Sequence, residues 1–185
     1  MLNINFQPFP TLGNETIVLR EIKHTDAAEL YMMRSNDEVM QYIDRPRASN
    51  IDDAHNLIAL YNANLQKNEG INWGISLKDS PQMIGLICLW KIQPDNHRAE
   101  VGYMLSPAYH RKGIMQQALK TVLDYGFTQI NLHSIEATVN PLNTASIALL
   151  EKTGFVREAY FKEDYFFNGV FLDTAIYSLI NPGHR

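Results

Sequence analysis

The chain has 185 residues and a mass of 21.2 kDa, which is the size of one domain with its own hydrophobic core. Sixteen Lys and Arg residues stand against 20 Asp and Glu residues, a net charge of −4. This balance argues against a nucleic-acid partner, because nucleic-acid binders carry a basic excess. One cysteine excludes an internal disulfide, and no run has the length of a membrane span or the order of a signal peptide. We therefore expect a single domain over residues 1–185, located in the cytoplasm and without a nucleic-acid or membrane partner.

The first half of the chain contains helix and strand patterns in turn. A strand is expected at 15–20, and two helices are expected to begin at the N-cap residues Asp26 and Asn50. For the first helix, Glu29 stands at the capping-box position. Turn residues separate three strand-like runs, which are 71–77, 83–92 and 98–105. Connections this short favour antiparallel pairing.

The second half begins with a change of period. After Gly113, apolar residues recur with a helical period. A strand at 135–139 and a short helix at 143–153 follow, and Asn168-Gly169 predicts a two-residue hairpin turn. Helices threaded between strands predict an α/β (α+β) fold, with a mixed, mostly antiparallel sheet of about seven strands flanked by about four helices.

The segment between Glu100 and Gln116 carries the strongest chemical signal. A strand runs into a short loop with Arg111, Lys112 and Gly113 and then directly into a helix. Backbone N–H groups at a helix start lack intrahelical partners and bind anions such as phosphate. Gly113 has no Cβ to keep a phosphate away. The alternative is an ordinary turn with a solvated basic pair.

Several motifs give the chain a resemblance to the GNAT superfamily of N-acetyltransferases. The first motif has the spacing with which this family holds the pyrophosphate of CoA, and consists of Leu105, Pro107, His110, Gly113 and Met115. It departs from the pattern in two places, since His110 replaces Arg or Gln and Met115 replaces Gly or Ala. A second motif, at 140–155, resembles the branch that acetylates the N-termini of ribosomal proteins. With the regions around Arg20 and at 157–177, the resemblance spans nearly the whole chain.

The resemblance implies acetyl-CoA as the cosubstrate, bound in a cleft where two parallel strands, here 98–105 and 135–139, splay apart. No metal is expected, because the six histidines form no short ligand spacing. The residues expected at the cofactor are Met104, Leu105, His110, Arg111, Lys112, Gly113, Ile114, Met115, Gln116, Asn140 and Asn143. Asn143 equally suits the N-cap of the following helix.

The resemblance also implies that the amine attacks the thioester directly. Glu100 is the candidate base, because it lies on the strand that leads to the thioester; the alternative is a structural glutamate facing Lys91 or Arg98. Ser146 is the candidate acid for the leaving thiolate, since Leu150 stands where many family members carry a tyrosine. Ser146 equally suits the first turn of a helix.

The resemblance further implies an acceptor groove walled by the first two helices and their connection, residues 36–50. Its candidate lining residues are Met40, Tyr42, Arg45 and Trp73, with core packing as the alternative for Met40 and Trp73. The acceptor is an amine, either the N-terminus of a ribosomal or other protein or a small molecule. Two alternatives to acetyl transfer remain: CoA binding without turnover, and transfer of a different acyl group. The chain is expected to be a monomer or a homodimer.

Overall fold

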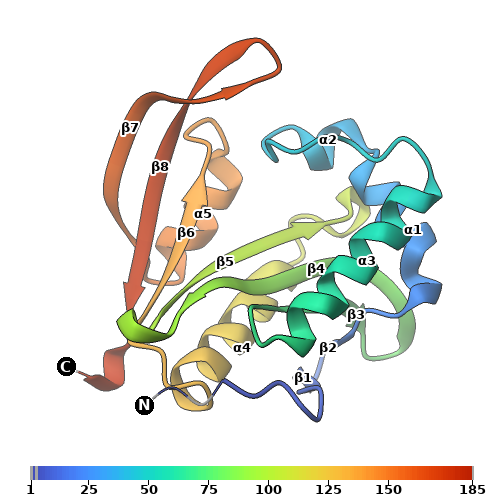
Figure 1. Cartoon of the computed structure of the whole chain (residues 1–185), viewed down its shortest axis with the longest axis horizontal. Helices are drawn as coiled ribbons and strands as arrows, with labels where there is room; N and C mark the ends of the chain where they lie inside the picture. Colours follow the sequence, from blue (N-terminus) through green and yellow to red (C-terminus); the bar gives the residue numbers. More distant parts are fainter. Residues whose placement is uncertain (1, 3, 185) are drawn as a thin grey trace.

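The computed structural model describes residues 2 and 4–184 and has one mixed sheet with helices on both faces (Figure 1). The strands are β1 (Leu12–Gly13), β2 (Ile17–Glu21), β3 (Ile71–Leu77), β4 (Ser80–Gln93), β5 (Arg98–Leu105), β6 (Ser134–Val139), β7 (Val156–Phe167) and β8 (Val170–Ile180). The α-helices are α1 (Ala27–Arg34), α2 (Asp37–Met40), α3 (Ile51–Gln66), α4 (Ile114–Thr128) and α5 (Thr144–Lys152). The predicted mixed sheet is confirmed. Two short elements, β1 and α2, were not predicted, because neither is long enough to show a period.

The eight strands lie in the order β1-β2-β3-β4-β5-β6-β8-β7. All neighbours pair antiparallel except β5 and β6, which are parallel. A parallel pair needs a crossover, and α4 supplies it. The predicted turn at Asn168-Gly169 is present between β7 and β8, with both residues at positive φ.

Apolar side chains form a core on each face of the sheet. On one face, α4 and α5 pack through residues such as Leu119 and Leu150. On the other face, α1 and α3 pack through residues such as Leu30 and Ile58. Because side chains alternate along a strand, β5 directs Leu105 to the first core and Met104 to the second.

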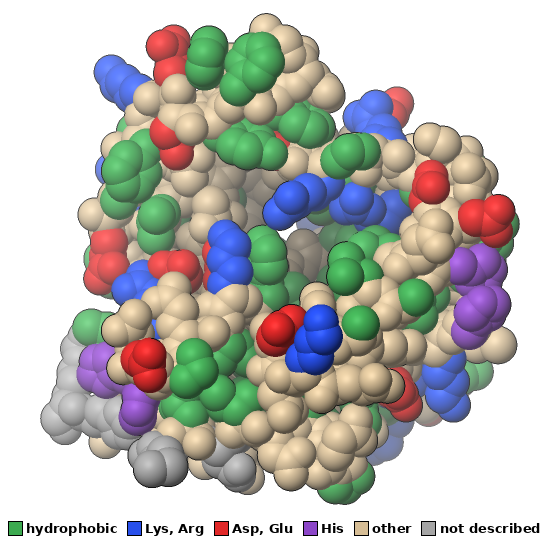
Figure 2. All heavy atoms as spheres, in the orientation of Figure 1, with side chains coloured by type: hydrophobic (Ala, Val, Ile, Leu, Met, Phe, Trp, Pro, Cys, Tyr) green, Lys and Arg blue, Asp and Glu red, His purple; other side chains and the backbone are tan. Residues whose placement is uncertain are grey.

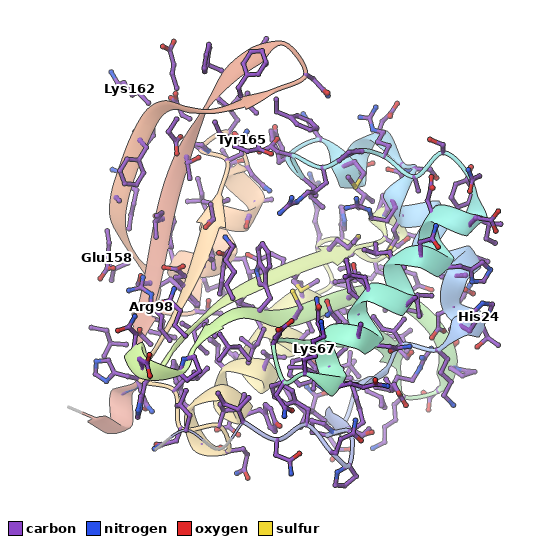
Figure 3. The ribbon with its side chains drawn as sticks, viewed as in Figure 1. His24, Lys67, Arg98, Glu158, Lys162 and Tyr165 are labelled. Carbon is purple, nitrogen blue, oxygen red and sulfur yellow. The ribbon has the colours of Figure 1, made fainter. Side chains whose placement is uncertain are left out.

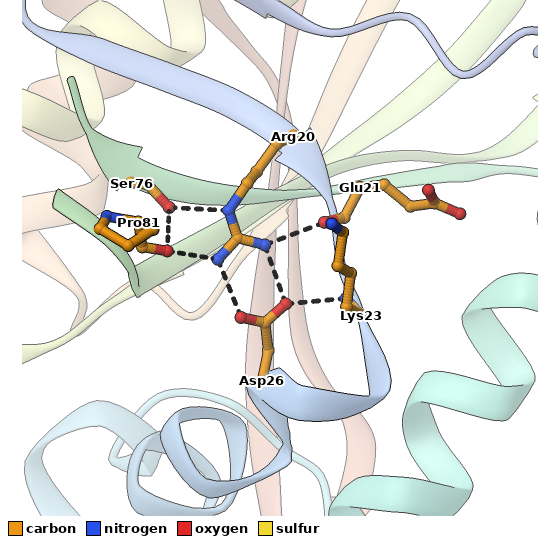
Figure 4. A network of polar contacts seen from close by, with 6 residues as sticks. All are labelled: Arg20, Glu21, Lys23, Asp26, Ser76 and Pro81. Carbon is orange, nitrogen blue, oxygen red and sulfur yellow. Dashed lines mark hydrogen bonds and ion pairs between the residues drawn. The ribbon is translucent and has the colours of Figure 1, made fainter.

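A hydrogen-bonded ion pair joins the N-terminal strands to the start of α1 (Figure 4). The two terminal nitrogens of Arg20 donate to the two carboxylate oxygens of Asp26, each at 2.8 Å. Arg20 also donates to Ser76 Oγ (3.1 Å) and to the carbonyl of Pro81 (2.7 Å). The Asp26 carboxylate is therefore occupied by Arg20 and by the N–H of Lys23, and it makes no capping bond to α1. The predicted capping box at Asp26 is wrong for this reason, whereas Asn50 caps α3 as predicted.

Burial by itself raises the pKa of Asp26, but the hydrogen bonds from Arg20 and from the Lys23 N–H outweigh it, and the pKa lies below its ordinary value. We expect Asp26→Asn to lower the free energy of unfolding by about 2 kcal/mol at pH 7. A carboxyl with a lowered folded-state pKa stabilises above its unfolded-state pKa of about 3.9, and this stability is lost as pH falls through the folded-state pKa.

Urea unfolding of the wild type and Asp26→Asn between pH 7 and pH 3 measures this difference. Asp37→Asn is the control, because its ion pair with Arg47 is exposed and should contribute less than about 0.5 kcal/mol. If the free energies of unfolding of the wild type and Asp26→Asn differed by the same amount over the whole pH range, the stabilising role of the ionised Asp26 would be contradicted.

Candidate active site

The parallel strands β5 and β6 separate after three paired residues. Arg98, Ala99 and Glu100 pair with residues 134–136, and the ladder ends there within the described chain. From Val101 to Leu105, the backbone groups of β5 that face β6 have no strand partner, although β4 pairs with the other edge. Figure 1 shows the two strands diverging toward the start of α4. The predicted splay between 98–105 and 135–139 is confirmed.

The start of α4 has free backbone donors. Gly113 occupies the N-cap position with a left-handed φ of +72°, and no side chain caps the helix. None of the described residues accepts a hydrogen bond from the amides of residues 111–116, whereas the amide of His110 donates to the carbonyl of Pro107 at 3.0 Å. A Cβ added at Gly113 would meet nothing within 4 Å. The helix start is therefore a positively polarised site open to an anion.

The side chains around this helix start are partly engaged with protein groups. His110 Nε2 lies 2.9 Å from the carbonyl of Leu105, and Nδ1 lies 3.4 Å from a carboxylate oxygen of Glu38. Lys112 Nζ stacks over the ring of Tyr109 at 5.3 Å. His110 thus connects the end of β5 to α2, and the backbone amides are the groups that remain available to a ligand.

Glu100 is buried, with 5% of its surface exposed. Its carboxylate lies 2.7 Å from the ammonium group of Lys91. Lys91 is one of the two partners expected if Glu100 had a structural role. Lys91 has a φ of +46° and follows Trp90 at a register shift between β4 and β5. Arg98 pairs with Glu136 instead. Glu100 therefore lies at the last paired position before the strands separate, and its ion pair with Lys91 orients the carboxylate.

A second polar pair joins the two sides of the splay. The hydroxyl of Tyr103 on β5 lies 2.8 Å from Ser146 Oγ on α5. Burial raises the pKa of Tyr103 to about 12, although the hydrogen bond with Ser146 opposes the change. Tyr103 was not predicted. Its partner Ser146 on α5 is brought close by the tertiary fold, for which the sequence contains no local signal. Leu150, in contrast, is fully buried.

The two asparagines at the start of α5 have local roles. Asn143 Oδ1 accepts the N–H of Ser146 at 3.0 Å, so Asn143 caps the helix. Asn140 Oδ1 accepts the N–H of Leu142 at 2.9 Å. For both side chains, no described residue accepts a hydrogen bond from the NH₂ group, so these donors remain available.

Two of the predicted acceptor residues belong to the interior. Trp73 has no exposed surface, and its indole N–H donates to the carbonyl of Pro10 at 2.8 Å. Trp73 points toward the α4 side, where it meets Tyr125 edge-on at 5.6 Å. Met40 is also buried. The prediction that Trp73 and Met40 line the groove is corrected, because both side chains are buried, as the alternative of core packing had it.

The other two predicted acceptor residues, Tyr42 and Arg45, lie on the partly exposed segment after α2. The guanidinium of Arg45 lies 6.0 Å from the ring of Trp90. Tyr165, from the hairpin β7–β8, donates its hydroxyl hydrogen to the carbonyl of Asp44 at 3.2 Å (Figure 3). Figure 2 shows a hollow between this hairpin and the helices α2 and α3, with Lys and Arg side chains along its edge. The long contact from Tyr165 had no signal in the sequence.

The part of the chain that the structure describes contains neither a metal-binding cluster nor a membrane-spanning helix. Residues 2 and 4–184 contain no group of three or more His, Cys, Asp or Glu side chains placed to hold a metal ion. No helix among these residues has the length and apolar character needed to cross a membrane.

Comparison with known proteins agrees with this geometry. The model of the GNAT acetyltransferase domain matches residues 16–156. The uncharacterized N-acetyltransferase YoaA of Bacillus subtilis is 34% identical over 174 residues, which cover 94% of this chain and 98% of that protein. The spermidine N(1)-acetyltransferase of Vibrio cholerae is 28% identical over 161 residues, covering 87% and 91%. The chain belongs to the GNAT family and is an N-acetyltransferase.

Solved structures show the same fold. A GNAT-family acetyltransferase from Bacillus anthracis superposes with a TM-score of 0.82 at 28% identity, covering 93% of this chain and 99% of that chain. The Vibrio cholerae spermidine N-acetyltransferase in complex with CoA and spermine has a TM-score of 0.80 at 27% identity, covering 91% and 97%. The ribosomal L7/L12 acetyltransferase RimL in complex with coenzyme A has a TM-score of 0.85 at 20% identity, covering 92% and 98%.

The reactivity of the Cys88 thiol tests how strongly its surroundings on β4 disfavour a negative charge. Burial raises its pKa to about 12 from an ordinary value of 9.0, and its S–H donates to the carbonyl of Gly102 at 3.4 Å. Because the thiolate is the reactive form, we expect the native thiol to react with a disulfide reagent about a thousandfold more slowly than in the unfolded chain at pH 8.

The rate constants in buffer and in urea, followed from pH 8 to pH 10, measure this effect. The native rate should rise about tenfold per pH unit over that range. Cys88 is the single cysteine, so Cys88→Ser is the blank. A native rate that levels off near pH 9 would contradict the assignment.

Proposed function

We propose that this enzyme transfers the acetyl group of acetyl-CoA directly to a primary amine, and that the amides of residues 111–116 receive the CoA pyrophosphate. The observation that carries the proposal is the set of free amides at Gly113 beside the separated strands β5 and β6. A phosphate there meets the positive end of the helix dipole, which contributes about 0.3–1 kcal/mol or more where water is excluded. Acetyl-CoA supplies the acetyl group as a thioester.

The side chains of Arg111 and Lys112 add positive charge around this position, and Ile114, Met115 and Gln116 contribute N–H groups. The unpaired edge of β5 at Met104 and Leu105 suits hydrogen bonding to the amide-containing arm of CoA, as does the free NH₂ of Asn143 across the splay. Glu100 lies five residues from Leu105, about 16 Å along the strand. This distance separates the proposed pyrophosphate site at the start of α4 from the proposed site of acetyl transfer near Glu100.

In this proposal Glu100 takes the proton of the acceptor amine, directly or through a water molecule. The ion pair with Lys91 fixes the direction of the carboxylate. Gly102, two residues further on the same face, lets Cys88 Sγ lie close to the strand, since an added Cβ would come within 3.3 Å of that sulfur. The high pKa of Cys88 argues against an acetyl-cysteine intermediate.

The hydroxyls of Tyr103 and Ser146 are placed to assist the leaving thiolate. A full proton transfer from Tyr103, with a pKa of about 12, to a thiolate with an ordinary pKa of about 8.5 is uphill by roughly 5 kcal/mol. We therefore assign the pair a role as hydrogen-bond donors that stabilise the thiolate. Ser146 acts through this pair and not as an isolated acid.

The names of the relatives support a primary amine as the acceptor but do not distinguish between kinds of amine. Spermidine is named for one group of relatives and ribosomal proteins for another, so polyamines and protein N-termini are both candidates. Tyr42 and Arg45 remain the residues proposed to meet the acceptor. A cytoplasmic location and the choice between monomer and homodimer stay predictions.

The glycine at the helix start gives the most direct test of cofactor binding. We expect Gly113→Ala to raise the Kd for acetyl-CoA about tenfold, or about 1.4 kcal/mol, because the new methyl group occupies the space left for phosphate. The measurement is the acetyl-CoA-induced shift in melting temperature, since ligand at 100 times Kd stabilises the native state by about 2.7 kcal/mol.

Gly169→Ala is the matched control for this substitution. Gly169 has a φ of +84° and, like Gly113, nothing within 4 Å of an added Cβ, so both variants carry the same backbone strain of about 1 kcal/mol. If the two variants lost the acetyl-CoA-induced shift in melting temperature to the same extent, the proposal that Gly113 lies at the phosphate would be contradicted.

The base is tested by Glu100→Gln. We expect kcat/KM to fall by about 10²- to 10³-fold near neutral pH, while the acetyl-CoA-induced melting shift is kept. The loss should shrink as pH approaches the pKa of the amine, because a free amine needs no base. Thiol release measures turnover, and Glu136→Gln is the control, since Glu136 pairs with Glu100 across the ladder and forms its own ion pair with Arg98.

A pH–rate profile of Glu100→Gln that matches the wild type would make Glu100 structural. A melting shift with acetyl-CoA but no thiol release from the wild type across a broad amine panel would favour the alternative of a CoA-binding module.

A further inference from the structure

Arg34, at the end of α1, is a cation without a counter-ion. Its guanidinium donates to the carbonyl of Pro46 at 2.9 Å, and no carboxylate of a described residue lies within 4.0 Å of it. The side chain is partly buried, where charged groups are normally paired. Burial lowers the pKa of Arg34, and the nearby charge of Arg45 adds to this effect.

Arg45 is a second cation near Arg34, but its side chain is exposed. Within the described chain it forms no ion pair, and its contact is the ring of Trp90, 6.0 Å from the guanidinium carbon. Lys91 Nζ lies 4.4 Å from the same ring and 2.7 Å from Glu100. Trp90 and Lys91 thus connect Arg45 to the carboxylate that we propose as the base.

The space beside Arg34 is large enough for a small polar group. A cavity of about 350 Å³ opens between α1, the segment after α2 and α3; it is lined by Arg34, Pro46, Arg47, Ala48, Ser49, Asp53, Ala54 and Leu57. The cavity lining also includes Arg47 and the carboxylate of Asp53. Arg47 pairs with Asp37 at 2.9 Å, and Asp53 accepts the N–H of Ser49 at 2.7 Å.

We propose that Arg34 and Arg45 bind a carboxylate of the acceptor, so that the preferred acceptor is a primary amine that also bears a carboxylate. This inference rests on the proposed function, because it places the amine beside Glu100. A carboxylate matches two guanidinium groups in charge and in hydrogen-bonding shape. A polycation such as spermidine would meet Arg34, Arg45 and Lys91 with charge of the same sign. An amino acid and a peptide with an acidic residue near its N-terminus both supply this chemistry.

The test compares amines that differ only in the carboxylate. The pairs are glutamate against its diamide, in which both carboxylates are replaced by amides, and two C-terminally amidated peptides that carry Glu or Gln at the second position; spermidine is assayed beside them. Thiol release from acetyl-CoA gives kcat/KM for each. We expect the carboxylate-bearing member of at least one pair to be favoured at least tenfold, which is about 1.4 kcal/mol, and to be favoured less at high salt. Preference for glutamate alone would identify a small-molecule acceptor, and preference for the acidic peptide a protein N-terminus.

Variants locate the preference. Arg34→Gln and Arg45→Gln should each reduce the ratio of kcat/KM for the two members of the favoured pair about tenfold, and Arg34→Lys should keep part of it. Arg157→Gln is the control, because Arg157 is exposed on β7 and stacks on Tyr160 at 5.9 Å; its ratio should equal that of the wild type.

Two results would overturn the inference, and they are distinguishable from failure of the proposed function. Equal kcat/KM within each wild-type pair, or a preference for spermidine, would contradict the carboxylate site while leaving acetyl transfer intact. Absence of thiol release with every amine would overturn the proposed function and this inference with it. The wild-type comparison needs no variant, so a variant that fails to fold does not rescue the proposal.

Discussion

The early end of the ladder between β5 and β6 is the constraint on which the site depends. Three residue pairs hold the strands together, and after Glu100 the backbone groups of β5 that face β6 have no strand partner. Unpaired backbone groups are costly unless water or a ligand satisfies them. The same is true of the amides at the start of α4. The fold thus keeps two sets of unsatisfied backbone groups, one on β5 and one at the start of α4, for which a long polar cofactor is a suitable partner.

Alternation along β5 divides the reaction between two faces of the sheet. Tyr103 points to the face covered by α4 and α5, where it meets Ser146. Glu100, three residues earlier, points to the face covered by α1 and α3, as Met104 does. In the proposed function, the leaving group and the acceptor therefore have different polar partners, and a single strand positions both. The acceptor side is closed further by Tyr165 over Asp44.

Local signals in the sequence predicted much of the fold and the uncapped helix start at Gly113, because N-caps, turn residues and glycines act over a few residues. The motif around Gly113 also carried the family resemblance, which the comparisons confirm. The contacts that were missed join distant segments: Tyr103 with Ser146, Tyr165 with Asp44, and Arg45 with Trp90. Trp73 was misplaced for a related reason, since only the tertiary structure shows that its side chain is buried against Tyr125 of α4.

Hydrogen exchange of the amides at residues 111–116, measured with and without acetyl-CoA, tests the central claim most directly. No residue that the structure describes accepts a hydrogen bond from these amides, so they should exchange rapidly in the free enzyme and slowly in the complex. Inorganic pyrophosphate at high concentration should protect the same amides in part. Unchanged exchange at 111–116, in a sample where acetyl-CoA raises the melting temperature, would show that the cofactor binds elsewhere and would contradict the account.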